Sequence, residues 1–219
     1  MLTNVQFLVG FTQNTIDQSP TYQGPSGQAA STTCSVNQAQ IKQCMDPRDV
    51  TAAVSMITSP NPPEYLVLFN EPDYSYENIT PLTSPQQAAS ALAPIFSVKT
   101  TTQFLSPAVA FTNTMWLNDF NNACDKCIDK HIPIIAAHIY NKLVDQVMLQ
   151  ITTLHKAWPD KRIWITELAP ASSADQGCEL DAQRVISWMQ SLLPQIVALG
   201  YVDRVFWNHG ESVRSRTQY

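Results

Sequence analysis

Two short stretches of the chain end in a glutamate that could take part in acid–base or nucleophilic chemistry. They are Tyr65–Asp73 and Arg162–Leu168, runs of β-branched and aromatic residues that carry Glu71 and Glu167. A glutamate at the carboxyl end of a buried strand lies where an α/β barrel places its reactive groups. Two such carboxylates are what hydrolysis of a glycosidic bond requires. Either glutamate alone could instead be a solvated loop residue, so the pair carries the argument.

Side-chain direction predicts which residues accompany the two glutamates. Alternate residues of a strand share a face. The predicted companions are Val67 and Phe69 on the first strand and Ile163 and Ile165 on the second. Trp164 has the opposite parity to Glu167, so we expect it to pack under a helix. We expect both glutamates at the open end of a barrel interior.

Further polar and aromatic residues stand at the ends of apolar runs. Asn70 precedes Glu71 directly, and Pro72 then ends the strand. His138 and Tyr140 are two residues apart and therefore share a face. Trp207 closes the last apolar run. His138 could equally be a core histidine with satisfied hydrogen bonds.

Strand-like and helix-like segments alternate along the chain. The predicted strands are Val5–Val9, Tyr65–Asn70, Phe104–Val109, Ile132–Tyr140, Arg162–Glu167 and Arg204–Asn208. The predicted helices are Asp46–Ile57, Pro85–Lys99, Thr114–Ala123, Leu143–Ala157 and Asp181–Leu199. The segment Thr12–Met45 is polar and is predicted to be a long loop. The strands are almost wholly apolar, which indicates a parallel sheet covered on both faces.

Alternating βα units form either an open doubly wound sheet or a closed barrel. The chain has six glycines and no glycine-rich phosphate loop, which argues against a nucleotide-binding sheet. We therefore predict an α/β fold of the (β/α)8 TIM-barrel type, as one domain over residues 1–219. Six predicted strands are fewer than the eight of that barrel, so it is expected to be incomplete.

Composition excludes several classes of partner. The 219 residues carry a net charge of −5, and their lysines and arginines are scattered, so we expect no nucleic-acid partner. No apolar run reaches the ~18 residues of a membrane-spanning helix. There is no GxSxG motif of a serine hydrolase. His155 and His209 lack partners at metal-ligand spacing, so we predict no metal site, and we predict no cofactor. We also expect the protein to be a monomer.

The five cysteines favour disulfide bonds over a metal site. Cys124 and Cys127 form a CxxC pair, but no second CxxC exists to complete a zinc site, and a thioredoxin motif should follow a strand. A local disulfide is the favoured interpretation. Cys34 and Cys44 could form a second bridge, which would leave Cys178 unpaired. Such pairings indicate an oxidising compartment, so we expect an extracellular or cell-wall location, although no signal peptide is visible.

The order of these motifs resembles clan A of the glycoside hydrolases, and most closely glycoside hydrolase family 128, fungal and bacterial β-1,3-glucanases. The matching segments are Phe69–Asp73, Ser106–Val109, Cys124–Cys127, His138–Tyr140 and Ile163–Glu167, and the resemblance spans roughly Val5 to Asn208. In that family the acid/base glutamate ends strand four and the nucleophile ends strand seven. By this comparison Val5–Val9 is strand three, and the first two strands are missing.

The resemblance implies a role for each candidate residue. Glu71 would be the acid/base and Glu167 the nucleophile of a retaining reaction on β-1,3-glucan. Asn70 would bind the sugar hydroxyl beside the reacting carbon. Tyr140 would orient Glu167, and His138 would support the cluster. Trp207 would form the floor of a sugar subsite by stacking.

The resemblance also leaves alternatives open. Tyr74, together with Tyr76, could shape a subsite at the rim. A non-catalytic protein that binds β-glucan oligosaccharides would keep these aromatic residues and lose turnover. A clan A hydrolase of another β-glycan, such as mannan, would carry the same two glutamates.

Overall fold

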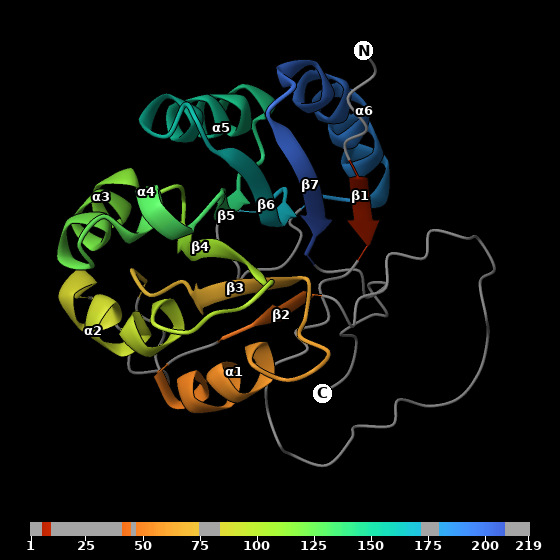
Figure 1. Cartoon of the computed structure of the whole chain (residues 1–219). Helices are drawn as coiled ribbons and strands as arrows, with labels where there is room; N and C mark the ends of the chain where they lie inside the picture. Colours follow the sequence, from red (N-terminus) through yellow and green to blue (C-terminus); the bar gives the residue numbers. More distant parts are fainter. Residues whose placement is uncertain (1–5, 10–40, 45–46, 75–83, 172–179, 209–219) are drawn as a thin grey trace, which may run out of the picture.

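The computed structural model describes residues 6–9, 41–44, 47–74, 84–171 and 180–208. Their strands form one parallel sheet in the order β1-β7-β6-β5-β4-β3-β2. The strands are β1 (Gln6–Val9), β2 (Ile41–Gln43), β3 (Tyr65–Asn70), β4 (Gln103–Ala110), β5 (Ile134–Tyr140), β6 (Arg162–Ala169) and β7 (Val202–Trp207). Figure 1 shows the helices on the outer side of the curled sheet. This is a partial TIM-type barrel, as the alternating pattern predicted.

Four of the described helices begin within one residue of the predicted start, whereas the first begins four residues after the predicted Asp46. The helices are α1 (Val50–Ile57), preceded by the 3-10 turn Pro47–Asp49, then α2 (Pro85–Phe96), α3 (Thr114–Ala123), α4 (Cys127–His131), α5 (Val144–Ala157) and α6 (Ala182–Leu199). The side chain of Ser84 accepts a hydrogen bond from the backbone of Gln87, which caps α2. Gly200 ends α6 with a φ of 73°, a left-handed conformation that glycine adopts without strain. Only the short α4 was absent from the prediction.

The placement of the first strand corrects one expectation. β1 pairs with β7, the last strand, and not with the strand that carries Glu71. β2 pairs with β3 and lies within the segment that was predicted to be a loop. If β3 is strand four of the barrel, β2 is strand three and β1 is strand one. In the described sheet the open position therefore lies between β1 and β2, rather than before β1.

The two faces of the sheet bury separate apolar clusters. One cluster contains residues of α1 to α6 together with Leu66, Phe69, Ile163 and Ile165, so it lies between the sheet and the helices. The other contains only strand residues, among them Val67, Leu105, Trp164 and Phe206, so it fills the inside of the curl. The strands are thus covered on both faces, as their apolar composition indicated.

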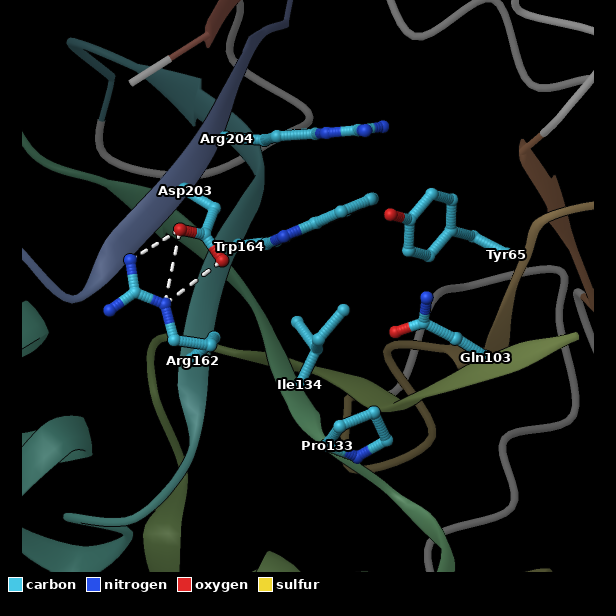
Figure 2. A pocket seen from close by; sticks show the side chains of 8 residues that line it. All are labelled: Tyr65, Gln103, Pro133, Ile134, Arg162, Trp164, Asp203 and Arg204. Atoms are coloured by element: carbon cyan, nitrogen blue, oxygen red, sulfur yellow. Dashed lines mark hydrogen bonds and ion pairs between the residues drawn. The ribbon is translucent and has the colours of Figure 1, made fainter. Parts of the chain in front are cut away.

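Irregularities in β3 and β6 changed the predicted parity. The β5–β6 register slips by one residue between Ile165 and Glu167, and β3 slips twice against β4 before Asn70. An extra residue turns the following side chains to the other face. Consequently Trp164 lies inside the curl, where its ring contacts Tyr65 and carries the guanidinium of Arg204 (Figure 2). The expectation that Trp164 packs under a helix was wrong.

Strand β4 contains a proline, and the serine before it adds a side-chain contact to the next strand. Pro107 has no N–H for the sheet. The backbone N–H of Ala136 on β5 donates to the hydroxyl of Ser106, at 2.9 Å. Ser106 is fully buried, so this hydroxyl acts as a sheet acceptor. The Ser-Pro pair therefore fixes β4 against β5 close to the strand end that carries His138.

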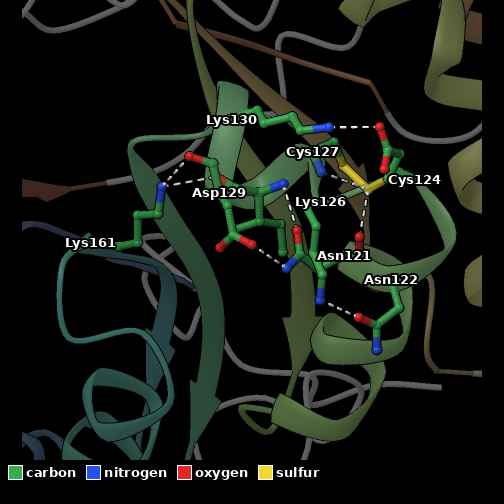
Figure 3. The surroundings of a disulfide bond; sticks show 10 residues. Asn121, Asn122, Cys124, Lys126, Cys127, Asp129, Lys130 and Lys161 are labelled. Atoms are coloured by element: carbon green, nitrogen blue, oxygen red, sulfur yellow. Dashed lines mark hydrogen bonds and ion pairs between the residues drawn. A yellow bond between two sulfur atoms is a disulfide. The ribbon is translucent and has the colours of Figure 1, made fainter.

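The predicted disulfide between Cys124 and Cys127 is confirmed, and it lies between α3 and α4 (Figure 3). Cys44 is buried, whereas Cys34 and Cys178 fall outside the described residues, so the second bridge stays a prediction. Among the described helices, none is both long and apolar enough to cross a membrane.

Candidate active site

The site begins with the backbone at the end of β3. Glu71 follows the last strand residue and adopts a φ of 39°, in the left-handed region that is costly for residues with a Cβ. Its N–H donates to the carbonyl of Ala108 on β4, at 2.8 Å, which holds this conformation in place. Phe111 and Thr112 also have positive φ just after β4. Strained backbone conformations of this kind are frequent at functional sites. Here the conformation directs the Glu71 side chain towards the carboxyl ends of the neighbouring strands.

Glu71, His138 and Glu167 lie together at the carboxyl ends of β3, β5 and β6. His138 Nδ1 is 2.7 Å from Glu71 Oε1 and 3.4 Å from Glu167 Oε2. His138 and Glu71 are almost fully buried, whereas Glu167 is half-buried. The structure thus joins three of the predicted residues through one imidazole, although they are far apart in sequence.

Tyr140 and Asn208 hold one oxygen of Glu167. The hydroxyl of Tyr140 donates to Glu167 Oε2. The side-chain amide of Asn208 donates to the same oxygen, at 3.0 Å, and to the Tyr140 hydroxyl. The backbone N–H of Asn208 donates to the carbonyl of Leu168, at 3.0 Å, which fixes the residue beside β6. Glu167 Oε1 makes no hydrogen bond within the described part of the chain.

Charge and burial act in opposite directions on His138. Burial disfavours the imidazolium, but the charge of Glu167 and the hydrogen bond and charge of Glu71 outweigh it, with a smaller contribution from Asp73. The pKa of His138 is therefore raised above its usual value. Burial, followed by the charge of Glu167, also raises the pKa of Tyr140, so the hydroxyl stays protonated as a donor. The cluster accordingly favours a cationic imidazole, and the charge of Glu167 is the largest contribution that stabilises it.

Asn70 is oriented by a residue that sequence reasoning missed. The side-chain amide of Gln43, on β2, donates to Asn70 Oδ1 at 3.1 Å. This hydrogen bond uses the Asn70 oxygen, so the Asn70 NH₂ group points the other way and can donate to a ligand. Gln43 is buried although it belongs to a polar segment. Only the pairing of β2 with β3 identifies it.

Two further residues shape the turn after β3. Asp73 accepts a hydrogen bond from the backbone N–H of Ala110, at 2.9 Å, which ties this turn to the end of β4. The ring of Tyr74 lies edge-on to Phe111, and Phe111 lies edge-on to Tyr140. Tyr74 therefore stands at the rim of the cluster, as expected of a subsite residue. Tyr76 falls outside the described residues.

Trp207 lies away from the cluster. Its ring contacts Trp188 of α6 and packs against the apolar cluster under the helices. Phe206 points into the curl, and alternation then brings Asn208, not Trp207, to the carboxylates. The side-chain amide of Asn208 therefore lies beside the carboxylates, where the ring of Trp207 was expected to stack on a sugar. The alternation along β7 could have indicated this, because neighbouring residues of a strand point to opposite faces.

The same three groups could be considered as metal ligands. One atom each from Glu71, His138 and Glu167 lies within 4.8 Å of the others. Ligands that share a zinc ion at ~2.0–2.2 Å would stand more than 3 Å apart. The 2.7 Å contact from His138 to Glu71 is the length of a hydrogen bond instead. We therefore interpret the cluster as a hydrogen-bonded acid–base network.

Comparison with known proteins decides the family. The family model for the glycosyl hydrolase catalytic core matches residues 18–219. The chain belongs to this family. The resemblance seen in the sequence is thus confirmed at the level of the family, and the two strand-end glutamates lie in the fold that it implied. No curated protein matches the chain.

Similar solved structures belong to glycoside hydrolase family 128. An exo-β-1,3-glucanase of subgroup VI from Aureobasidium namibiae is 16% identical, with a TM-score of 0.61, over 83% of this chain and 68% of that one. An endo-β-1,3-glucanase of subgroup I from Amycolatopsis mediterranei, in complex with laminaripentaose, is 19% identical with a TM-score of 0.60, over 76% and 70%.

A third similar structure is not described as an enzyme. It is a subgroup VII oligosaccharide-binding protein from Trichoderma gamsii, 20% identical with a TM-score of 0.63, over 85% of this chain and 75% of that one. At these identities the likeness establishes the fold. The fold therefore hosts both β-1,3-glucanases and oligosaccharide-binding proteins.

Proposed function

We propose that this chain hydrolyses β-1,3-glucan with retention of the anomeric configuration. The observation that carries the proposal is the distance between its two carboxylates. An oxygen of Glu71 and an oxygen of Glu167 lie within 4.8 Å of each other. Retaining enzymes place the carboxyl groups ~5–5.5 Å apart, whereas inverting enzymes need ~6.5–9.5 Å to admit a water molecule. The spacing supports nucleophilic attack by a glutamate.

In the first step Glu167 attacks the anomeric carbon and Glu71 protonates the departing glycosidic oxygen. Tyr140 and Asn208 both donate to Glu167 Oε2, which leaves Oε1 for the attack. His138 occupies Glu71 Oε1, whereas the buried Oε2 has no partner among the described residues. We assign the transferred proton to Oε2.

In the second step the glycosyl ester on Glu167 is hydrolysed. Glu71, now ionised, takes a proton from water as the water attacks the anomeric carbon, and the ester bond to Glu167 breaks. The proton taken from water restores the protonated Glu71 Oε2. Asn70 donates to the sugar hydroxyl next to the reacting carbon in both steps, and the hydrogen bond from Gln43 to Asn70 Oδ1 supports this role.

The test is hydrolysis of laminarin by the chain and by two variants, Glu167→Ala and Glu71→Gln. Each variant should lose at least about 10³-fold in kcat, since each removes a group that takes part in bond making or breaking. Azide should restore turnover in Glu167→Ala and give a glycosyl azide of inverted configuration. The exposed Asp160→Asn variant, which also removes a carboxylate, should keep full activity. Undiminished turnover in either glutamate variant would reject the site.

Substrate controls separate the alternative hydrolases. Mannan and a β-1,4-glucan, assayed beside laminarin, test whether another β-glycan is the substrate. Turnover of either control in place of laminarin would move the proposal to another clan A activity and leave the two glutamates in their roles.

A binding function without turnover is the second candidate. It is favoured by the likeness to the oligosaccharide-binding protein and by the open position between β1 and β2 in the described sheet. Calorimetry with laminari-oligosaccharides distinguishes the two. Binding without products, even at high protein concentration, would replace hydrolysis by recognition of the same ligand.

We also propose that the protein works outside the cell or in the cell wall. The disulfide between Cys124 and Cys127 supports this location, because such bonds persist in oxidising compartments. Quantification of free thiols in material purified from culture medium would test it. A reduced pair in the secreted protein would contradict the proposal.

A further inference from the structure

A second concave site lies at the opposite end of the strands. A pocket of about 300 Å³ is lined by Tyr65, Gln103, Arg162, Trp164, Asp203 and Arg204, as shown in Figure 2. Tyr65, Gln103 and Arg162 are the first residues of β3, β4 and β6. Tyr65 and Glu71 are six residues apart on one strand, which corresponds to ~20 Å. The pocket is therefore separate from the carboxylate cluster.

Arg204 supplies a cation to this pocket. Its guanidinium lies 4.2 Å from the centre of the Trp164 ring and 4.8 Å from that of Tyr65. Within the described part of the chain it forms no ion pair. A guanidinium that stacks on rings through its face still presents its N–H groups along its edge. That edge matches the two oxygens of a carboxylate or phosphate.

Trp164 supplies a second donor that lacks an acceptor. Its side chain is 2% exposed, and its indole N–H has no hydrogen-bond partner among the described residues. Buried donors are almost always satisfied. The indole N–H groups of Trp158 and Trp188 are also unpaired among the described residues, but of the three rings only Trp164 lines this pocket, where a ligand can supply the acceptor. The hydroxyl of Tyr65 and the amide of Gln103 line the same space.

The charged side chains that line the pocket are two arginines and one aspartate. Asp203 accepts hydrogen bonds from Arg162 through both carboxylate oxygens, and Arg162 also donates to the carbonyl of Gly200. The aspartate is thereby paired, and Arg204 remains as the net charge of the lining. The carboxylate of Glu64, which hydrogen-bonds with Tyr65, lies outside that lining.

We propose that this pocket binds a small oxyanion, a carboxylate or phosphate carried by a molecule of monosaccharide size. The edge of the Arg204 guanidinium binds two oxygens of the anion, and the Trp164 indole donates to an oxygen of the same ligand. Neutral sugars lack the charge that Arg204 requires. The site is independent of the proposed hydrolysis, because no residue of the carboxylate cluster lines it.

The experiment follows the indole N–H signals by ¹H–¹⁵N correlation spectroscopy on the full chain. Trp164→Phe keeps an aromatic ring and identifies the Trp164 signal by its loss. Glucuronate and glucose 6-phosphate are the two anionic probes, and glucose is the neutral probe. We expect saturable movement of the Trp164 signal with one or both anions, at a Kd of about 1 mM or tighter, and none with glucose. The anion with the lower Kd identifies the carboxylate or the phosphate as the recognised group.

Arg204→Gln should weaken anion binding at least about tenfold, because it removes the charged guanidinium group but keeps two N–H donors. Arg184→Gln removes an exposed arginine of α6 and should leave binding unchanged. Glu167→Gln should also bind normally, which separates this pocket from the active site. The proposal is overturned if neither anion moves the Trp164 signal. It also fails if Arg204→Gln only lowers the unfolding temperature while anion affinity stays at the wild-type value.

Discussion

At the scale of single residues, Glu167, the proposed nucleophile, is held by donors from two other strands. Tyr140 comes from β5 and Asn208 from the end of β7, and both donate to one oxygen of Glu167. Two donors to one carboxylate oxygen stabilise its charge and fix the direction of the other oxygen. Asn208 does not need to touch the sugar for this effect, so we regard it as a positioning residue.

Replacing Asn208 by alanine should therefore lower kcat by about 10- to 100-fold, the value of one hydrogen bond to a charged group. KM for laminarin should change little, since Asn208 acts through Glu167. Asn208→Gln, which keeps an amide on a longer stem, tests position rather than chemistry. An unchanged kcat in Asn208→Ala, or a loss that appears only in KM, would rule out this role.

At the scale of elements, the junction of α3 and α4 depends on one buried asparagine. The side chain of Asn121 accepts a hydrogen bond from the backbone of Ile128, at 2.9 Å, and donates to Asp129, at 3.0 Å (Figure 3). The amine of Lys161 donates to the carbonyl of Ile128, which ties α4 to the start of β6. These contacts explain how a helix as short as α4 holds its position beside the disulfide.

Asn121→Ala should lower the free energy of unfolding by about 1–3 kcal/mol, since it leaves the buried Ile128 N–H without an acceptor. The neighbouring Asn122→Ala removes an exposed side chain that accepts a hydrogen bond from Lys126, and it should change stability by less than about 0.5 kcal/mol. Urea denaturation with the disulfide intact measures both. Equal stability of the two variants would contradict the role of Asn121.

At the scale of the whole molecule, the partial barrel uses its two ends differently. The carboxyl ends of the strands gather Glu71, His138 and Glu167, and the amino ends gather the aromatic and cationic pocket around Arg204. The apolar interior separates them. The charge at the carboxyl end also links folding to pH, because His138 joins strands β3, β5 and β6 through its two carboxylate partners.

The raised pKa of His138 predicts how stability varies with pH. A raised folded-state pKa means that the folded protein binds the proton more tightly than the unfolded chain. The resulting stabilisation is fully present below the unfolded pKa of ~6.5 and disappears as pH rises through the folded value. The unfolding temperature, measured from pH 6 upward, should therefore fall more steeply for the wild type than for His138→Asn. Parallel curves would show that His138 is not cationic in the folded protein.

The βα alternation and the two glutamates at strand ends could be predicted from the sequence alone. The sequence also determined the cysteine pair between α3 and α4, because apolar period, helix caps and local spacing are encoded by neighbouring residues. His138 and Tyr140 were found for the same reason, since both stand at the end of one apolar run.

The tertiary structure decided which side chains meet. The irregular register of β3 and β6 turned Trp164 into the interior, and alternation on β7 brought Asn208 rather than Trp207 to the carboxylates. The pairing of β1 with β7 and the existence of β2, with Gln43, depend on contacts between segments that are distant in sequence. Such choices follow from sheet register and strand order, which are set by packing across the whole barrel and not by local pattern.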